Sequence, residues 1–585
     1  MRHNSAFVLA FALLAPMAVA KSTYQVTVDG ATGGLTIQIT ASARGGKVDF
    51  QIPNWAPGSY RLVDHFKSVS DVKAWAGSVE TSVDHPTDTL WSVKAGDGTE
   101  VRFRYNMPGR LNSGTVHYSG PSTYMYLAGR IMEPIVLKLN LPSGWESACG
   151  LDSVGIHEYV ADDYDVLADN PVTVGNFLSD TYTVEGVPHQ IVYHSGDATG
   201  IDRKKVIEFC TYVTKSQSDF WGGLPFKKYV WHFSPINAQD GGWGLEHLSS
   251  TQIGLATGLG PGTISVCSHE YFHAWNVKRV RSGPLGPFDY QVLPKTGALW
   301  WLEGVTDYYA DVLLHRYGYF DEEYFLGNIV SNLNRTRSNQ QRFEVSPYDS
   351  SYRVGEAANG RGNSAGYGVN YYNTGWLVGL CLDIEMRTQT AGRRSLDDVC
   401  IALNEICKEG KPGFGEDEIR KQLVRFGGAA LGTAYDDWVM KAGELPVEVQ
   451  LAKMGLELKQ VERELPSFGI AGNFDRTNNV LLVGAATGSA KLLLEPDDVI
   501  VSIAGTEMSA ARGNPARGLR TLESKSTIGE TVEMVVKRGS ETKTVSLQVG
   551  SRKLTEPMVV PSPSHAATKK LRDGWYYAAK PRLAP

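Results

Sequence analysis

Two histidines and a glutamate stand at a spacing that suits metal chemistry. The segment HEYFH places His269 and His273 four residues apart, with Glu270 directly after the first histidine. On a helix, positions i and i+4 share a face, so both imidazoles can reach one metal ion and the glutamate can take a proton from water bound there. The alternative is a pair of core histidines beside an incidental acid.

A hydrolytic zinc site needs a third protein ligand and an open fourth position. One class of such sites continues with a glycine and then a histidine, but Asn276 and Arg279 occupy those places here,. A glutamate on a second helix is the other solution, and Glu303 in the segment LWWLEGVTDYYAD fits it. Asp307 is four residues further on and could orient a ligand imidazole. Two imidazoles and a carboxylate suit one zinc ion per chain.

The elements that must carry these residues are helical. Helical patterns dominate from residue 262 to about 450 and include the segments 263–280 and 298–318,. The irregular connection from Ser282 to Gly297 could wall the site,. Cys267 lies about 200° around the helix from His269, so we expect it to pack rather than to bind metal,.

The rest of the chain reads as β structure. Residues 21–190 alternate in short strands and predict an N-terminal β-sandwich,. Residues 191–455 form the α-rich unit, and residues 456–550 return to short strands with one helical insert, as in a small α+β module,. The tail, 551–585, ends in a Trp-Tyr-Tyr cluster and either stays loose or packs back onto the body.

Length and composition are those of a multidomain globular protein. The chain has 585 residues, and its hydrophobic content of 42% excludes a disordered chain,. Its net charge is −6, so there is no sign of the basic surface that nucleic-acid binding requires,. Residues 1–20 have the three-part pattern of a removed signal peptide, so we expect export to the periplasm or the medium; a buried N-terminal helix is the alternative,. We expect no membrane span,. Among the six cysteines we do not expect a pair between Cys400 and Cys407, because a helix over 396–409 would hold them about 10 Å apart,.

The metal-site segments SHEYFHAWNVKRVR and LWWLEGVTDYYAD resemble the glycyl aminopeptidase family of zinc metallopeptidases. The segment PNWAPGSY, residues 53–60, extends the resemblance into the β-rich region. The resemblance implies a thermolysin-like (gluzincin) catalytic domain between an N-terminal β-domain and a C-terminal PDZ domain. It also implies a preference for glycine, and for alanine as a second choice, at the substrate's first residue.

Three further roles are implied by the resemblance. The segment Gly244-Leu-Glu246-His is similar to the motif that related aminopeptidases place along the substrate, where Glu246 would hold the free α-ammonium group,. Tyr372 lies in a Tyr-x-x-Gly element and would donate to the oxyanion, although the adjacent Tyr371 leaves the register open by one residue,. A surface turn for Glu246 and a core position for Tyr372 are the alternatives.

The C-terminal module carries Asp498-Val-Ile and Ile-Ala-Gly505, which resemble the strand-entry motif of PDZ domains, with Asp497 where glycine is usual. The loop at Ser467–Ile470 could receive a peptide carboxylate,. A peptide ligand, or docking within the chain, is therefore expected for this module.

The sequence thus predicts an exported zinc aminopeptidase acting on peptides with a free N-terminus. A zinc endopeptidase and a binding protein with an inert metal site remain open.

Overall fold

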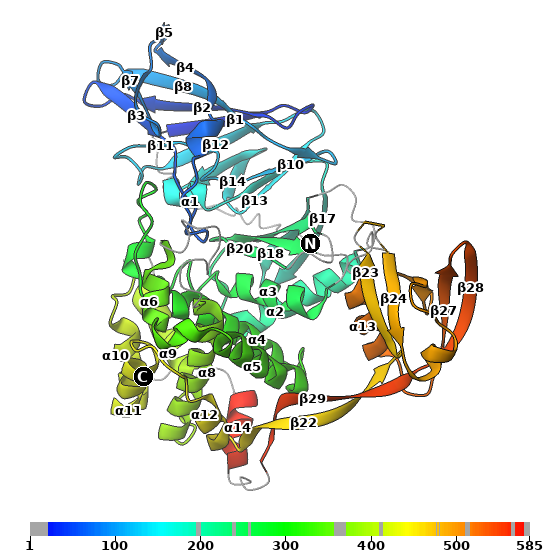
Figure 1. Cartoon of the computed structure of the whole chain (residues 1–585). Helices are drawn as coiled ribbons and strands as arrows, with labels where there is room; N and C mark the ends of the chain where they lie inside the picture. Colours follow the sequence, from blue (N-terminus) through cyan, green and yellow to red (C-terminus); the bar gives the residue numbers. More distant parts are fainter. Residues whose placement is uncertain are drawn as a thin grey trace, which may run out of the picture.

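The computed structural model describes residues 22–194, 201–236, 242–255, 259–355, 370–408, 413–475, 477–478, 480–508, 515–562 and 568–577. The expected signal peptide, 1–20, lies outside these residues. Figure 1 shows an N-terminal β-rich domain (blue and cyan), a helical catalytic domain (green and yellow) and a C-terminal β domain (orange). Within the described residues, no helix combines the length and the apolar character that crossing a membrane requires.

The N-terminal domain is built from three sheets around one core. Side chains alternate between buried and outward positions along β1, β2 and β8, as expected for strands with one face on a core,. Phe50 of β3 stacks on Phe103 of β8 with ring centroids 4.2 Å apart, which joins two sheets face to face. The large sheet runs in the order β14 (Asp152–Gly155), β15 (Glu158–Ala161), β12 (Ile135–Asn140), β1 (Ser22–Val28), β2 (Leu35–Ser42), β8 (Glu100–Met107), β4 (Ser70–Ala76) and β5 (Val79–Thr81). The first smaller sheet runs β13 (Glu146–Cys149), β16 (Val172–Gly175), β10 (Thr115–Tyr118) and β9 (Leu111–Asn112). The second runs β11 (Tyr126–Leu127), β3 (Lys47–Gln51), β7 (Leu90–Lys94) and β6 (Asp84–Thr87). Helix α1 (Tyr164–Ala168) contacts β15 of the large sheet.

The domain that follows contains one five-stranded sheet in its described part. The order of this sheet is β17 (Leu178–Val184), β18 (Val187–Tyr193), β19 (Tyr229–Pro235), β21 (Ser250–Leu255) and β20 (Gly244–Glu246), so β18, which spans residue 190, pairs with β17 on one side and with β19 on the other. Helix α2 (Arg203–Trp221) connects β18 to β19; it starts at an Asp202 side-chain cap and ends at Gly222, whose φ is +85°,. The other helices are α3 (Pro261–Phe272), the π-helix η3 (Trp300–Val305), α4 (Thr306–Arg316), α5 (Glu322–Arg337), α6 (Pro347–Tyr352), α8 (Tyr371–Gln389), α9 (Leu396–Cys407), α10 (Glu418–Gly427), α11 (Ala429–Trp438) and α12 (Val447–Lys453).

The C-terminal β domain is attached through a long two-stranded ribbon of β22 (Leu456–Ser467) and β29 (Gly550–Pro561), visible at the lower right of Figure 1. Asp497 has a φ of +68°, which explains why glycine would also suit this position,. The domain's own sheet contains β23 (Ile470–Asp475), β24 (Val480–Ala486), β25 (Val499–Ile503), β27 (Thr531–Arg538) and β28 (Glu541–Gln548), with β26 (Thr506–Glu507) beside β25 and α13 (Pro515–Lys525) against it.

The tail packs back onto the catalytic helices. Residues Lys569–Tyr576 form α14, and the Trp575 indole donates to the Tyr308 hydroxyl at 2.8 Å. Arg316 donates to the Trp575 carbonyl at 3.0 Å. Of the two possibilities for the tail, the packed one therefore holds for its described residues. All six cysteines are buried and none is in a disulfide.

Candidate metal centre and active site

Helix α3 carries the HEYFH segment at its C-terminal end. The helix ends at Phe272, and residues 273–279 continue as turns, whereas the sequence pattern predicts helix to residue 280. His273 keeps helical dihedral angles, so it stays on the same side as His269,. The turn presents the carbonyl of Asn276 to His273, whose Nδ1 donates to it at 2.6 Å and whose Nε2 then faces the site,.

Glu303 lies on the π-helix η3, not on the regular α-helix that the sequence pattern predicts. Asn276 contributes to this wider turn, because its side-chain amide donates to the Trp301 carbonyl at 3.3 Å and to Thr306 Oγ1 at 2.9 Å. Single π-turns are frequent at functional sites. Asp307 follows in the first turn of α4 and lies on the same side as Glu303.

The side chains of these two elements converge on one point. The Nε2 atoms of His269 and His273 are 2.8 Å apart, and Oε2 of Glu303 is 3.4 Å and 3.1 Å from them. Asp307 Oδ1 is 2.7 Å from Nδ1 of His269, so the two imidazoles are held from behind by an aspartate and by a backbone carbonyl. Two inward-facing imidazole nitrogens beside a buried carboxylate are the donor set that zinc prefers,.

The pKa values of the two glutamates of the centre are shifted in opposite directions. Burial alone raises the pKa of Glu303, but His273 and His269 outweigh burial and hold this pKa below its ordinary value. Burial raises the pKa of Glu270 above its ordinary value, and the two histidines only partly oppose it. Oε2 of Glu270 is buried without a hydrogen-bond partner among the described residues. Glu303 is thus held as a carboxylate, and Oε2 of Glu270, which has no partner among the described residues, is free to exchange a proton.

Strand β20 passes directly over Glu270. A Cβ built on Gly244 would lie 2.2 Å from Glu270 Oε1, so only glycine allows the strand to run this close to the carboxylate. Glu246, two residues on, is 5% exposed, and its carboxylate lies within 4.8 Å of the polar side-chain atoms of Glu270 and His273. The structure therefore places Glu246 at the metal centre rather than on a surface turn.

The N-terminal domain closes the site from the other side with residues that the sequence reasoning did not single out. A Cβ built on Gly58 would lie 3.0 Å from Glu246 Oε1, and Tyr60 is buried near Glu246 and Glu303, both of which raise its pKa after burial itself. The PNWAPGSY segment was the available sequence signal.

A buried lysine stands next to Glu246 and was also missed. Nζ of Lys278 is 2.8 Å from Asp169 Oδ1 and 3.8 Å from Glu246 Oε1. Its position in the turn after α3, five residues beyond His273, was the only sequence signal. Because Asp169 is the nearer partner, Glu246 retains capacity for a second cation.

The two tyrosines at the start of α8 differ in how deeply they are buried. The Tyr372 ring is 6.0 Å from the His269 ring and is half-buried, whereas Tyr371 is 2% exposed and stacks on Tyr372. Burial and then Glu303 raise the pKa of Tyr372, so its phenol stays protonated and able to donate. Cys267 is fully buried in the core of the catalytic domain.

A cavity of about 810 Å³ opens between the N-terminal and catalytic domains. Tyr60, Glu246 and Lys278 line it, as do Leu285 and Phe288 of the irregular connection between the two metal-site helices. This connection therefore walls the cavity, which reaches the Glu246 side of the centre.

Comparison with known proteins decides the family. The profile of the M61 glycyl aminopeptidases matches residues 262–378, and the profile of the M61 N-terminal domain matches residues 23–176. The chain belongs to the M61 glycyl aminopeptidase family. This M61 protein is a metallopeptidase, as the sequence predicted.

A solved structure with a TM-score above 0.5 shares the fold of this M61 peptidase, and others are similar over part of the chain. An aminopeptidase N family protein from Idiomarina loihiensis is 21% identical, with a TM-score of 0.73 over 95% of this chain and 100% of the other. An M1 zinc metallopeptidase from Deinococcus radiodurans bound to a Tyr-Ser-Ala substrate is 14% identical, with a TM-score of 0.47 over 73% of this chain and 94% of the other. Yeast LTA4 hydrolase in complex with bestatin is 11% identical, with a TM-score of 0.48 over 73% and 68%. No curated protein matches the chain.

Proposed function

We propose that this M61 peptidase is a zinc-dependent aminopeptidase. The observation that carries the proposal is the convergence of His269 Nε2, His273 Nε2 and Glu303 Oε2 within 3.4 Å of one another, beside the unpartnered carboxylate of Glu270. These three donors would hold one zinc ion. When bound, zinc supplies Lewis-acid polarisation of the substrate carbonyl and lowers the pKa of a water molecule.

The chain's own residues supply the proton transfers and the orientation. Glu270 takes the proton of the attacking water and passes it to the leaving amine, which its buried and unpartnered Oε2 allows,. Tyr372 donates its phenol proton in a hydrogen bond to the oxyanion as the carbonyl carbon becomes tetrahedral. Asp307 holds the His269 ring in place through Nδ1,.

Glu246 favours an exopeptidase over an endopeptidase. Its carboxylate would accept the substrate's free α-ammonium, because it lies within 4.8 Å of Glu270 and is only partly neutralised by Lys278,. A peptide whose amine is blocked lacks this ion pair. The N-terminal residue would thus be the one removed.

The preference for glycine, with alanine second, would arise because residues packed around Glu246 leave little space for the side chain of the substrate's first residue. Gly58 packs against Glu246, and Tyr60 fills the adjacent space in the N-terminal domain. Tyr60→Ala should therefore widen the range of accepted first residues, measured as the ratio of kcat/KM for leucyl and glycyl substrates. An unchanged ratio would remove Tyr60 from the pocket wall.

Metal analysis combined with a panel of aminoacyl chromogenic substrates, with and without chelator, tests the function. We expect zinc in the active protein, loss of activity with chelator, recovery with zinc, and the fastest turnover of glycyl substrates. Cleavage of N-terminally blocked peptides at internal bonds would indicate an endopeptidase. Metal binding without hydrolysis of any substrate would indicate an inert site.

We propose that the C-terminal β domain is a PDZ domain whose carboxylate loop is occupied by a side chain of the domain itself. The Phe468 amide of the candidate carboxylate loop donates to Glu523 Oε1 at 2.8 Å, and the Ser467 hydroxyl donates to the same oxygen at 3.2 Å. An internal carboxylate thus uses the position that a peptide C-terminus would need. We expect no binding of peptides with a free carboxylate by fluorescence anisotropy, and micromolar binding would contradict this.

We also propose that residues 1–20 direct export and are then removed. N-terminal sequencing of the protein from its producing cells should begin at Lys21. A mature protein that begins at Met1 would contradict the proposal.

A further inference from the structure

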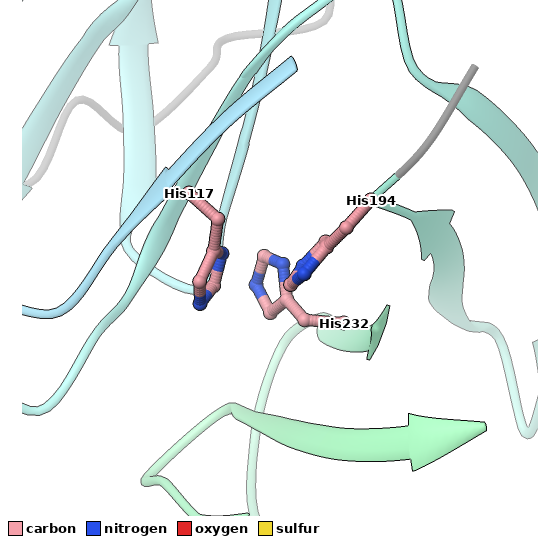
Figure 2. Close-up of side chains that lie close together, drawn as sticks. All are labelled: His117, His194 and His232. Carbon is pink, nitrogen blue, oxygen red and sulfur yellow. The ribbon is translucent and has the colours of Figure 1, made fainter. Parts of the chain in front are cut away.

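Three histidines outside the proposed active site lie together where the N-terminal domain meets the catalytic sheet. His117 belongs to β10, His232 to β19, and His194 directly follows β18. Figure 2 shows the three rings turned toward one another from these separate strands. The ring centroid of His117 is 4.0 Å from that of His194 and 5.3 Å from that of His232.

One hydroxyl group sits among the three rings. Oγ1 of Thr173, on β16, is 2.8 Å from His117 Nδ1, 3.2 Å from His194 Nε2 and 2.8 Å from His232 Nδ1. A hydroxyl has one proton, so it can donate to only one of these nitrogens and must accept from the others. The three inward nitrogens therefore compete for one small polar group.

The outward nitrogens of two rings are held by neutral partners. His117 Nε2 contacts Gln252 Oε1 at 2.6 Å, and His194 Nδ1 contacts Ser234 Oγ at 2.7 Å. When each ring donates outward, His117 Nδ1 and His194 Nε2 both carry a lone pair that points inward. This second layer of hydrogen bonds orients imidazoles as it does around bound metal ions.

His232 completes the set with a vacant nitrogen. The residue is fully buried, and its Nε2 has no hydrogen-bond partner among the described residues. A buried ring nitrogen without a partner is unfavourable, because its lost hydration is not replaced, and such a nitrogen is open to a ligand. Nδ1 of His232 contacts Thr173 inside the cluster, so it can bind a metal without breaking a hydrogen bond to a described residue outside the cluster.

The surroundings of all three rings favour the neutral imidazole. Burial lowers the pKa of His117 to about 4, and burial followed by the charge of the neighbouring histidines lowers the pKa of His194 and His232. Each ring then has a lone pair available, and an ion would meet little competition from protons.

We propose that His117, His194 and His232 bind a second divalent transition-metal ion, of the imidazole-preferring class that includes zinc and copper. One ring nitrogen from each lies within 4.8 Å of the others, as a single ion requires,. The hydroxyl of Thr173 stands at hydrogen-bond distance from all three and is available as a fourth ligand. Since His117 comes from the N-terminal domain and His232 from the catalytic sheet, the ion clamps the two domains together.

The proposed three-histidine site is linked by hydrogen bonds to the part of the active site that contains Glu246. From His117, hydrogen bonds continue through Gln252 to His247 (2.8 Å) and on to Asp169 (3.1 Å). Asp169 in turn holds Lys278, the neighbour of Glu246. A bound ion would thus hold in place the residues next to Glu246. The occupancy of this ion site must therefore be measured separately from enzyme activity.

Metal counting on the full mature chain tests the proposal, with Zn²⁺ as the probe. The double variant His269→Gln/His273→Gln removes the proposed catalytic ion. After chelator treatment, zinc reloading and gel filtration, we expect about two zinc ions in the wild type and one in the double variant. Adding His232→Gln should reduce this to none, whereas His85→Gln, an exposed histidine of the N-terminal domain, should leave one. A double variant that retains no zinc, or a triple variant that keeps its ion, would overturn the proposal.

Copper spectroscopy covers the case in which His232→Gln does not fold. The double variant loaded with one equivalent of Cu²⁺ should show nitrogen hyperfine splitting from several imidazoles in its electron paramagnetic resonance spectrum. Its Tm should also rise by several degrees with Zn²⁺, because an ion that binds only the folded state stabilises it. A spectrum without nitrogen splitting, together with an unchanged Tm, would refute the second site.

Discussion

Gly304 and Gly375 bring the helices of Glu303 and Tyr372 into backbone contact. A Cβ built on Gly304 would lie 2.5 Å from the Cα of Gly375, and one built on Gly375 would lie 2.3 Å from the carbonyl oxygen of Trp300. The glycine of the Tyr-x-x-Gly element is thus a packing requirement of the π-helix η3 and α8. This contact sets how far the candidate oxyanion donor stands from the metal ligand.

Gly375→Ala should therefore damage both stability and turnover. The added methyl group must push η3 and α8 apart, which commonly costs about 1–3 kcal/mol of stability and moves Glu303 away from Tyr372. Thermal unfolding and kcat on a glycyl substrate measure the two effects. Gly327→Ala is the control, because a Cβ there meets nothing within 4 Å in the middle of α5. The control should be neutral or slightly more stable.

Glu270→Gln should retain zinc and lose most of its turnover. The amide keeps the shape of the side chain but cannot accept the proton of water, so we expect kcat to fall about 10²–10⁴-fold. Metal content and kcat are measured on the same preparation. Glu208→Gln on the exposed face of α2 serves as the control. Normal rates, or a variant without metal, would contradict the role of Glu270 as a base.

Glu246→Gln should separate free from blocked substrates. Loss of the carboxylate removes the ion pair with the α-ammonium, so kcat/KM should fall at least tenfold for peptides with a free amine. Any slow cleavage of N-acetylated peptides should stay unchanged. Equal losses on both substrates would mean that Glu246 acts on the metal centre as a whole and not on the amine.

Tyr372→Phe should lower kcat much more than it changes KM. The phenol would act on the oxyanion only in the transition state, and one such donor is commonly worth about 3 kcal/mol, or about 10²-fold in rate. Tyr371→Phe is the matched comparison, since this neighbour is buried beneath Tyr372. The reverse pattern would assign the donor role to Tyr371.

Asp311→Asn should flatten the pH dependence of stability. Burial, followed by the charge of Asp307, raises the pKa of Asp311 to about 7 from 3.8. The folded protein then holds a proton that the unfolded chain releases between these values, so stability falls as pH rises through this window. Asparagine can accept from the Trp376 indole through Oδ1 and donate to the Ser265 hydroxyl through Nδ2, so it should be more stable at pH 8, by about 4 kcal/mol at most,. Asp437→Asn, at an exposed position, should keep the wild-type slope of unfolding free energy against pH.

Local patterns were sufficient for much of the architecture. Alternating residues predicted the strands of the N-terminal domain, and the i, i+4 spacing predicted that His269 and His273 share one side of a helix, as they do. The π-helix at Glu303 was not predictable, because it depends on Asn276 bonding across to Trp301 and on a glycine of another helix. The same applies to the docked tail, whose Trp575 meets Tyr308 far back in the chain.

Short-range spacing thus determined which residues could bind a metal and which could move a proton, because helix geometry relates neighbours within one turn. Only the tertiary structure decided what surrounds them. Tyr60 and Lys278 reach Glu246 from separate elements, Asp169 holds Lys278 there, and His117 meets His232 across two sheets. Such contacts depend on how sheets and helices pack over long sequence separations, and no local period in the chain records them.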